Sequence, residues 1–360
     1  MARAQAHIAA MAPYALADMT PQADRPLISL AQNEGFRPPS PMTQKQAAEA
    51  FALGMLYPDP DWTGLRCALA ALHRIMEQGI LCGNGSLELI GALARVYSGP
   101  DRAVLAPRHA YPFFRTAAQI ADARFDTAEE NDLTVDIDSL LSAVCADTGL
   151  VFIANPGNPT GTRIPKPDLV HLRRELRDDI LLVIDEAYGE FADHLCEPCF
   201  DMVESGNTAV LRTFSKAYCM AGFRVGWGLF PPVVAAEVRK VLNPNNIAAL
   251  SQTAALAALN DQSYMRETCD LTAALKDQAV NELRNAGYRV RPSYTNFVLI
   301  EFASSEAAEM ADQRLRAEGV ILRRQSGAGL PHALRMTIGP ALSTKKALDY
   351  LCRWKRGALS

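Results

Sequence analysis

Segment 211–229 concentrates the side chains that could do chemistry. Its opening apolar run ends at Arg212 and is followed by Thr213, Ser215, Lys216 and Arg224. Hydroxyls and a guanidinium are the groups that hold a phosphate dianion. A lysine at the end of a buried strand stands where a carbonyl compound can reach its amine. Taken alone, the pattern is equally typical of a solvated loop, so the rest of the chain has to decide.

A phosphate site beside a reactive amine indicates pyridoxal phosphate, which a lysine holds as a Schiff base. Asp185 ends the apolar run 180–184. Facing a pyridine nitrogen, its carboxylate would keep that nitrogen protonated, and Tyr188 could donate to the phenolic oxygen of the ring. The plainer alternative is a strand-end aspartate that caps the next segment. The turn NPGNPTG, residues 155–161, would hold Asn158 as a rigid donor, or is simply a structural loop.

Two further candidates lie in the first third of the chain. Gly85 and Ser86 open a helical pattern, and a helix N-terminus favours an anion. Ser86 could equally be a simple N-cap. Tyr111 could lie flat against a cofactor ring or pack in the core beside two phenylalanines.

The elements that would position these residues follow from alternating apolar runs and helical patterns. The strands are predicted at 103–106, 150–154, 180–184 and 209–212, with a helix over 165–179. Strands that are apolar throughout indicate a parallel sheet covered on both faces. Ligands bind beyond the C-terminal ends of such strands, and Tyr111, Asn158, Asp185 and Lys216 all follow such ends.

After about residue 245 the pattern changes to that of a smaller α+β unit. A long helix is predicted over 252–286 with a break near Asp261, followed by helices at 305–318 and 343–355 and by strands that include 320–323 and 334–339. Arg335 could clamp a substrate carboxylate or form a surface ion pair; Arg323 and Arg324 suit an anionic substrate tail or solvent. The predicted division is an N-terminal arm (1–45), a large domain (46–245) and a small domain (246–360).

Composition limits the function classes. The 360 residues carry a formal net charge of -4, so no basic surplus points to nucleic acid, and no apolar run is long enough for a membrane span. The eight cysteines are scattered, which indicates reduced thiols in a cytoplasmic protein. His194, Cys196 and Cys199 have a metal-like spacing but lack a second pair of ligands, so no metal is expected.

With these motifs in order, the chain resembles the fold-type I pyridoxal phosphate enzymes of the aspartate aminotransferase superfamily, and within them the histidinol-phosphate aminotransferase group. The resemblance begins near Leu30 and rests on SLAQNEGFRPPSP, LYPDPDWTGLRCALA, GNGSLELI, NPGNPTGT, VIDEAYGEF, RTFSKAYCMAGFRVGW, TNFVLIEF and LRMTIG. It implies an α/β fold with a mostly parallel central sheet in the large domain and a smaller α+β C-terminal domain.

The resemblance also implies roles. Lys216 would bind the cofactor and move the proton, Asp185 would pair with the ring nitrogen, and Tyr111 would stack on the ring. The other implied cofactor contacts are Asn158 and Tyr188 at the phenolic oxygen, Thr213, Ser215, Arg224 and the Gly85–Ser86 backbone at the phosphate, and Tyr57 at the phosphate of a partner subunit. That last contact implies a homodimer. Arg335, with Asn33 and Glu34 beside it, would bind or border the substrate.

Two departures from the family pattern are visible. The N-terminal element, often Asn-Glu-Asn-Pro in the family, here reads Asn33-Glu34-Gly35-Phe36, which bears on the pocket wall. Leu87 precedes Glu88 where the family often has Asp-Glu, beside the phosphate loop.

The function implied is transamination between glutamate/2-oxoglutarate and either histidinol phosphate/imidazole acetol phosphate or an aromatic amino acid. Two alternatives stay open: a decarboxylase of the phosphothreonine type, and a non-catalytic protein that binds pyridoxal phosphate. The complete set of lysine, aspartate and arginine argues against the second of these.

Overall fold

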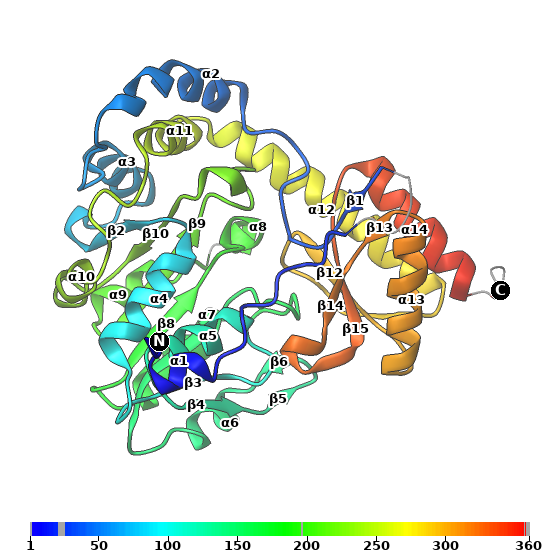
Figure 1. Cartoon of the computed structure of the whole chain (residues 1–360), viewed down its shortest axis with the longest axis horizontal. Helices are drawn as coiled ribbons and strands as arrows, with labels where there is room; N and C mark the ends of the chain where they lie inside the picture. The colour runs from blue at the N-terminus through cyan, green and yellow to red at the C-terminus, as the bar shows by residue number, and fades with distance from the viewer. Residues whose placement is uncertain (1, 21–25, 196, 356, 358–360) are drawn as a thin grey trace.

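The centre of the molecule is a seven-stranded sheet, seen in a computed structural model that describes residues 2–20, 26–195, 197–355 and 357. The strand order is β2–β10–β9–β8–β7–β3–β4 (Figure 1). The strands are β2 (Ile80–Gly83), β3 (Ala103–Pro107), β4 (Phe125–Ala128), β7 (Thr148–Ala154), β8 (Leu181–Asp185), β9 (Thr208–Thr213) and β10 (Gly226–Leu229). From β9 to β4 all neighbours are parallel, whereas β10 runs antiparallel to both β2 and β9.

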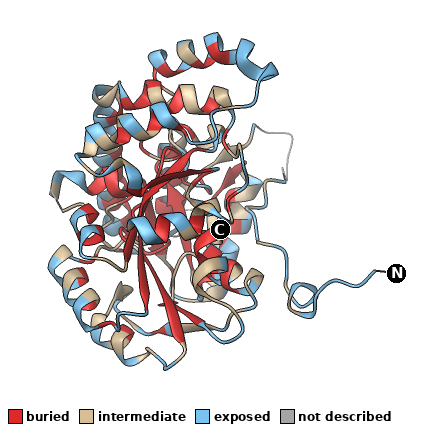
Figure 2. Ribbon diagram, turned by 90° about the vertical axis from the view of Figure 1, so that its left-hand side faces the viewer, coloured by how far each residue is buried: buried red, intermediate tan, exposed pale blue. Residues whose placement is uncertain are grey.

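The parallel strands are apolar because helices cover them. Every residue of β3, β8 and β9 is buried, and Figure 2 shows these strands at the centre with helices around them. The surrounding helices are α2 (Pro41–Glu49), α3 (Thr63–His73), α4 (Ser86–Tyr97), α5 (Pro112–Ile120), α6 (Ile137–Ser142), α7 (Lys166–Glu175), α8 (Gly189–Ala192), α9 (Phe200–Glu204), α10 (Pro232–Arg239) and α11 (Ala249–Leu259). The sequence of α7 shows why: Leu169 and Leu172 are buried against the sheet, while Asp168, Arg174 and Glu175 are exposed.

The predicted strands fall on β3, β7, β8 and β9, and the predicted helix falls on α7. The antiparallel edge formed by β10 and β2 was not predicted. β10 reads GWGL, and glycines give no alternating apolar pattern. The structure explains these glycines, because a Cβ on Gly228 would lie 2.7 Å from the side chains of Leu211 and Phe230.

A second, four-stranded sheet has the order β11–β12–β15–β14. Its elements are β11 (Arg289–Val290), β12 (Phe297–Glu301), β14 (Arg323–Gln325) and β15 (Leu330–Thr337), covered by α12 (Gln262–Asn285), α13 (Ser305–Ala317) and α14 (Ala341–Lys355). Two smaller pairs are β5 (Glu130–Asn131) with β6 (Thr134–Val135), and β1 (Ile28–Ser29) with β13 (Val320–Ile321); α1 (Ala6–Ala9) is a short N-terminal helix.

The single strand predicted at 320–323 is wrong. The chain forms two strands there: β13 pairs in parallel with β1, and β14 pairs with β15. The physical reason is the N-terminal arm, since Ile28 lies opposite Val320 and supplies β13 with a partner that is far away in sequence. The helix break near Asp261 is confirmed: α11 ends at Leu259, and the Asp261 side chain caps α12 by accepting from the Tyr264 amide at 3.3 Å.

The two main hydrophobic cores take in opposite ends of α12. The larger surrounds the seven-stranded sheet and includes Met265 near the start of α12. The smaller contains Ala279 and Leu283 from the end of α12, together with Leu30 from the N-terminal arm. The α/β architecture is therefore as predicted; the boundaries at residues 45 and 245 stay predictions. Among the described residues, no helix has both the length and the apolar character to cross a membrane.

Candidate active site

One large cavity collects the residues singled out from the sequence. Its volume is about 1450 Å³, and it lies where β7, β8 and β9 end, between them, the N-terminal segment and the smaller sheet. The predicted residues on its wall are Asn33, Glu34, Ser86, Tyr111, Asn158, Asp185, Tyr188, Thr213, Ser215, Lys216, Arg224, Arg323, Arg324 and Arg335. The C-terminal ends of parallel strands lie at the same edge of the sheet, which is why residues so far apart in sequence meet here.

Lys216 follows β9 and opens onto the cavity. Its Nζ donates to the backbone oxygens of Gln32 at 3.2 Å and Asn33 at 3.0 Å. Burial is the main cause that lowers the pKa of Lys216 to about 7, and the nearby Arg335 guanidinium acts in the same direction. The neutral amine is thus well populated near neutral pH, and a neutral amine is a nucleophile and a base.

Asp185 is the last residue of β8 and is buried at 4% exposure. Its Oδ1 accepts from the Ala187 amide at 3.1 Å. Burial raises the pKa of Asp185 to about 7; the adjacent Glu186 adds to the rise, while the Ala187 amide and Lys216 oppose it. A carboxyl group with such a pKa becomes fully ionised once a cation is placed against it.

Gly85, Ser86, Thr213, Ser215 and Arg224 form a small concave site at the start of α4, called the cradle below. Gly85 precedes this helix with φ +76°, and a Cβ there would overlap the Arg224 guanidinium. Arg224 donates to Ser215 Oγ at 3.3 Å, and Thr213 Oγ1 donates to the same oxygen at 3.0 Å. The hydroxyls, the guanidinium and the Ser86 amide at the helix N-terminus therefore converge, which is the donor set for a phosphate group.

The side chains of Asn33, Asn158 and Tyr188 form another part of the cavity wall. Tyr188 Oη accepts from Asn33 Nδ2 at 2.8 Å, so the phenolic proton of Tyr188 remains available to a ligand. Asn158 Oδ1 accepts from Arg335 Nη1 at 2.6 Å, which orients the Asn158 amide. Burial raises the pKa of Tyr188 to about 12, so this phenol stays protonated. Tyr111 stands at the start of α5, with its ring edge-on to Phe114 at 5.7 Å.

Arg335 enters the cavity from β15. Its Nη2 donates to Ala31 O at 2.8 Å, whereas its Nε is buried and has no hydrogen-bond partner. A buried guanidinium nitrogen without a partner is costly, and an anionic ligand would relieve that cost. Arg323 lies directly opposite Arg335 in the β14–β15 register and donates to Ala15 O, while Arg324 pairs with Glu309 at 3.2 Å.

Two predicted residues differ in placement from the rest. Gly85 does not line the cavity, and its lack of a side chain leaves room for the Arg224 guanidinium. Tyr57 is 89% exposed and lies outside the cavity of its own chain. It follows the 3-10 turn 50–55, where Phe51 and Met55 are also exposed, at 80% and 86%. The contact of Tyr57 with a partner subunit stays a prediction.

The sequence analysis missed several residues of the cavity wall. Tyr14 comes from the N-terminal segment, packs edge-on against Phe113 at 5.8 Å and lines the cavity. Arg108, Arg115 and Arg316 also line it. No local signal marks Tyr14, because its segment has no regular structure and reaches the site only through tertiary packing. The three arginines lie on or next to regular elements, and only the folding of the chain brings them to one cavity.

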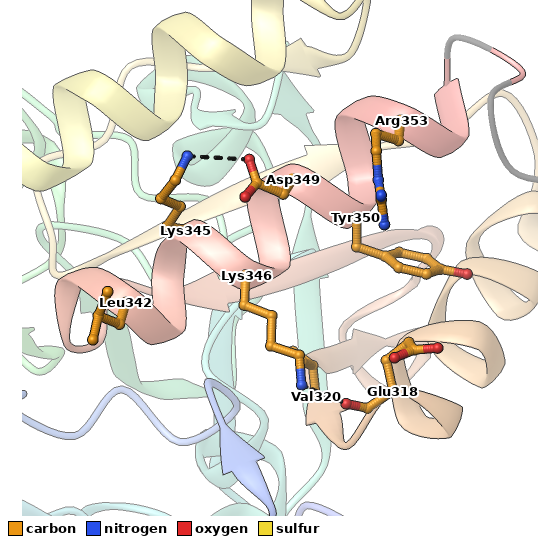
Figure 3. A pocket seen from close by; sticks show the side chains of 8 residues that line it. All are labelled: Glu318, Val320, Leu342, Lys345, Lys346, Asp349, Tyr350 and Arg353. Atoms are coloured by element: carbon orange, nitrogen blue, oxygen red, sulfur yellow. Dashed lines mark hydrogen bonds and ion pairs between the residues drawn. The ribbon is translucent and has the colours of Figure 1, made fainter.

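The suggested metal motif lies partly outside the described residues, and a second hollow lies apart from the large cavity. Cys196 lies outside the described residues, and within those described no group of three or more His, Cys, Asp or Glu side chains could hold a metal ion. The second hollow, about 560 Å³, lies beside α14 and shares no lining residue with the large cavity (Figure 3). Its two lysines have partners within the chain: Lys345 pairs with Asp349, and Lys346 donates to Glu318 O.

Comparison with known proteins assigns the chain to a family. Residues 25–354 match the model of the aminotransferase class I and II family, and the chain belongs to that family. Members of such a family transfer amino groups between small amino and keto compounds.

Individual relatives are similar over most of the chain. The chain is 36% identical over 354 residues to the histidinol-phosphate aminotransferase of Rhodospirillum centenum, covering 96% of this chain and 97% of that protein. It is 41% identical over 322 residues to that of Paramagnetospirillum magneticum, covering 87% of each. The crystal structure of histidinol-phosphate aminotransferase from Sinorhizobium meliloti in complex with pyridoxal-5'-phosphate superposes with a TM-score of 0.92 at 27% identity, covering 100% of this chain and 99% of that one.

Proposed function

We propose that this chain is a pyridoxal phosphate-dependent aminotransferase whose amino donor is histidinol phosphate or an aromatic amino acid. Glutamate and 2-oxoglutarate form the second couple. The observation that carries the proposal is the pair formed by Lys216 and Asp185. An amine and a carboxyl group, each with a pKa of about 7, stand at the end of neighbouring strands on the wall of one cavity.

The residues present fit pyridoxal phosphate. The cradle at Gly85 and Arg224 has room and donors for the phosphate, and a Cβ on Gly226 would collide with the Gly85–Ser86 backbone that forms it. Arg224, Ser215 and Thr213 would hold the phosphate. When bound, the cofactor supplies a carbonyl for the amine and a ring that accepts the electron pair left on the substrate α-carbon.

The chain's own residues then divide the work. Lys216 Nζ, largely neutral above pH 7, would accept the proton from the substrate α-carbon and later give it up again, acting first as a base and then as an acid. The Asp185 carboxylate would accept a hydrogen bond from the ring nitrogen. Tyr188 and Asn158 would hold the phenolic oxygen, Tyr111 would cover the ring, and Arg335 would orient the anionic end of the substrate.

The arginines support an anionic substrate. Arg335 offers a buried Nε without a partner, and Arg323 stands directly opposite it in the sheet. Two neighbouring guanidinium groups favour a phosphate or a carboxylate. Asn33 and Glu34 border the same space, and Asn296 Nδ2 holds the backbone oxygens of both, at 3.1 and 3.2 Å.

The functional unit we propose is a homodimer. The exposed apolar side chains of Phe51, Met55 and Leu56 form a continuous stretch that ends at Tyr57. Packing this stretch against a second copy would bury it and bring Tyr57 toward the partner's cofactor phosphate. We also propose a cytoplasmic location, since the scattered cysteines suit a reducing compartment.

A panel of amino donors tests the function. Purified protein loaded with pyridoxal phosphate is mixed with histidinol phosphate, phenylalanine, tyrosine, glutamate or phosphothreonine, and conversion of the cofactor to its amine form is followed by absorbance. We expect rapid conversion by glutamate and by histidinol phosphate or an aromatic amino acid, and none in Lys216→Ala.

Three results would narrow or refute the proposal. Failure of histidinol phosphate beside success of tyrosine would leave the reaction class unchanged and assign the enzyme to aromatic substrates. Release of carbon dioxide from phosphothreonine without amino transfer would favour the decarboxylase. A protein that binds no pyridoxal phosphate would refute the proposal altogether.

A further inference from the structure

A buried ionic cluster adjoins the candidate active site and has no part in the mechanism described so far. Arg212, only 2% exposed, donates to Glu186 Oε2 from Nε at 3.0 Å and from Nη2 at 2.9 Å. Its Nη2 also reaches Asp193 Oδ1 at 3.0 Å, and its Nη1 lies 3.4 Å from Glu190 Oε1. One guanidinium thus faces three carboxyl groups, two of which are fully enclosed.

The cluster joins the two strand ends that carry the reacting groups. Glu186 directly follows Asp185, and Arg212 precedes Thr213 on the way to Lys216. The backbone repeats this link, because the Glu186 amide donates to Leu211 O at 2.8 Å. The Arg212–Glu186 pair therefore ties the end of β8 to the end of β9 by side chains as well as by the sheet.

The guanidinium is held from several sides. The first residue of α8 is Gly189, where a Cβ would lie only 2.7 Å from Arg212 Cζ. The Phe200 ring of α9 packs at 5.0 Å from Arg212 Cζ. His73 from α3 stacks on Trp227 nearby, and burial, followed by the repulsion of Arg212, lowers the pKa of His73 to about 4, so His73 brings no competing charge.

Charge is the reason this arrangement matters for Asp185. The charged or titratable groups that act on Asp185 are Glu186 along the strand, Lys216 beyond β9, and the tyrosines 111 and 188. Glu186 is the neighbour that opposes ionisation of Asp185, since like charges close together disfavour each other. Arg212 neutralises the Glu186 carboxylate through their ion pair. Burial and Asp193 raise the pKa of Glu190 to about 7, although Arg212 acts in the opposite direction.

We propose that Arg212 is a positioning residue for the reaction: by neutralising Glu186 and tying β8 to β9, it keeps the Asp185 carboxylate ionised and aimed at the cofactor ring. The inference rests on the proposed function, because it assigns Asp185 to the ring nitrogen. It differs from a purely structural role in one respect. If the charge balance between Arg212 and Glu186 sets the ionisation of Asp185, removing one charge should disturb that ionisation and removing both should restore it.

The experiment compares Arg212→Met, Glu186→Gln and the double variant with the wild type. The matched control is Arg124→Met, which removes an exposed arginine that forms ion pairs with Asp126 and Asp147. Binding of pyridoxal phosphate to the cofactor-free protein is titrated across pH 5 to 9, and thermal unfolding reports folding. Lys216 also titrates near pH 7, so the shift of the midpoint from that of the wild type, and not the midpoint itself, is assigned to Asp185, the group on which Glu186 acts.

Opposite shifts are expected for the two single variants. Arg212→Met exposes Asp185 to an unbalanced Glu186, so the midpoint rises by about one pH unit and affinity at neutral pH falls by up to about tenfold. Glu186→Gln removes the like charge beside Asp185 while Arg212 keeps Glu190 and Asp193 as partners, so the midpoint falls. The double variant returns to within about half a unit of the wild type, and Arg124→Met does not move it.

Each other outcome overturns the inference. A double variant that binds as poorly as Arg212→Met would leave Arg212 with a packing role only. If Arg212→Met fails to fold, the downward shift in Glu186→Gln and a wild-type-like midpoint in the double variant are still required. Wild-type protein that binds no pyridoxal phosphate refutes the proposed function instead, so the two failures are distinguishable.

Discussion

Replacing Lys216 by methionine should change the pH dependence of stability in a predictable direction. In the cofactor-free protein the pKa of Lys216 is lowered from 10.5 to about 7, chiefly by burial. The unfolded chain therefore holds the lysine proton more tightly than the folded chain between these two values. Stability rises with pH wherever the unfolded state binds more protons, so the wild type should gain stability through this window.

The magnitude follows from the two pKa values. Because Lys216 binds its proton more tightly in the unfolded chain, the unfolding free energy of the wild type is lowered by roughly 4 kcal/mol at pH 7 and by roughly 2 kcal/mol at pH 9. Methionine has a similar volume and no proton, so the variant lacks this term. The difference in unfolding free energy between wild type and variant should thus move by about 2 kcal/mol in favour of the wild type from pH 7 to pH 9.

Urea unfolding of both cofactor-free proteins at the two pH values provides the assay. Lys345→Met serves as the control, because Lys345 is an exposed partner of Asp349 on α14 and its loss should give the same difference at both pH values. Lys216→Met should also be inactive. An identical wild-type-to-variant difference at pH 7 and pH 9 would show that Lys216 ionises normally in the folded protein and would refute the reasoning.

The remaining predictions concern the cofactor and the dimer. Asp185→Asn should lower kcat by about 100-fold or more in steady-state transamination, since a neutral amide cannot hold the ring nitrogen protonated, and a near-normal kcat would contradict that role. Gly85→Ala should weaken binding of pyridoxal phosphate by about tenfold or more in a titration, because φ +76° disfavours alanine and its Cβ would overlap Arg224, whereas Gly91→Ala, with open space around it, should bind like the wild type. Met55→Asp should shift the protein from dimer to monomer in sedimentation analysis, and an unchanged mass would refute the proposed interface.

Local patterns were sufficient to predict the elements that carry the site. β3, β7 and β8 are continuous apolar runs because both faces of a parallel sheet are covered, and a polar residue at the end of such a run stands out. Asp185 and Lys216 were found in this way. The break before α12 was also visible, since Asp261 has a side chain suited to capping.

Contacts between distant segments could not be predicted. β13 is a separate strand only because β1 pairs with it, and Tyr14 reaches the cavity only because the N-terminal segment lies along it. The bonds from Lys216 to the backbone of Gln32 and Asn33 join residues more than 180 positions apart. No local periodicity records such neighbours.

The sequence by itself determined which groups are available: an aspartate at the end of one apolar run, a lysine shortly after another, and several arginines, in the order typical of an aminotransferase. Only the tertiary structure decided their chemical state. Enclosure in a folded interior brings the pKa values of Lys216 and Asp185 to about 7, and the packing of α8 and α9 encloses Arg212 with its carboxylates. The physical reason is that desolvation and charge–charge interaction depend on distances in space, which the order of residues along the chain does not contain.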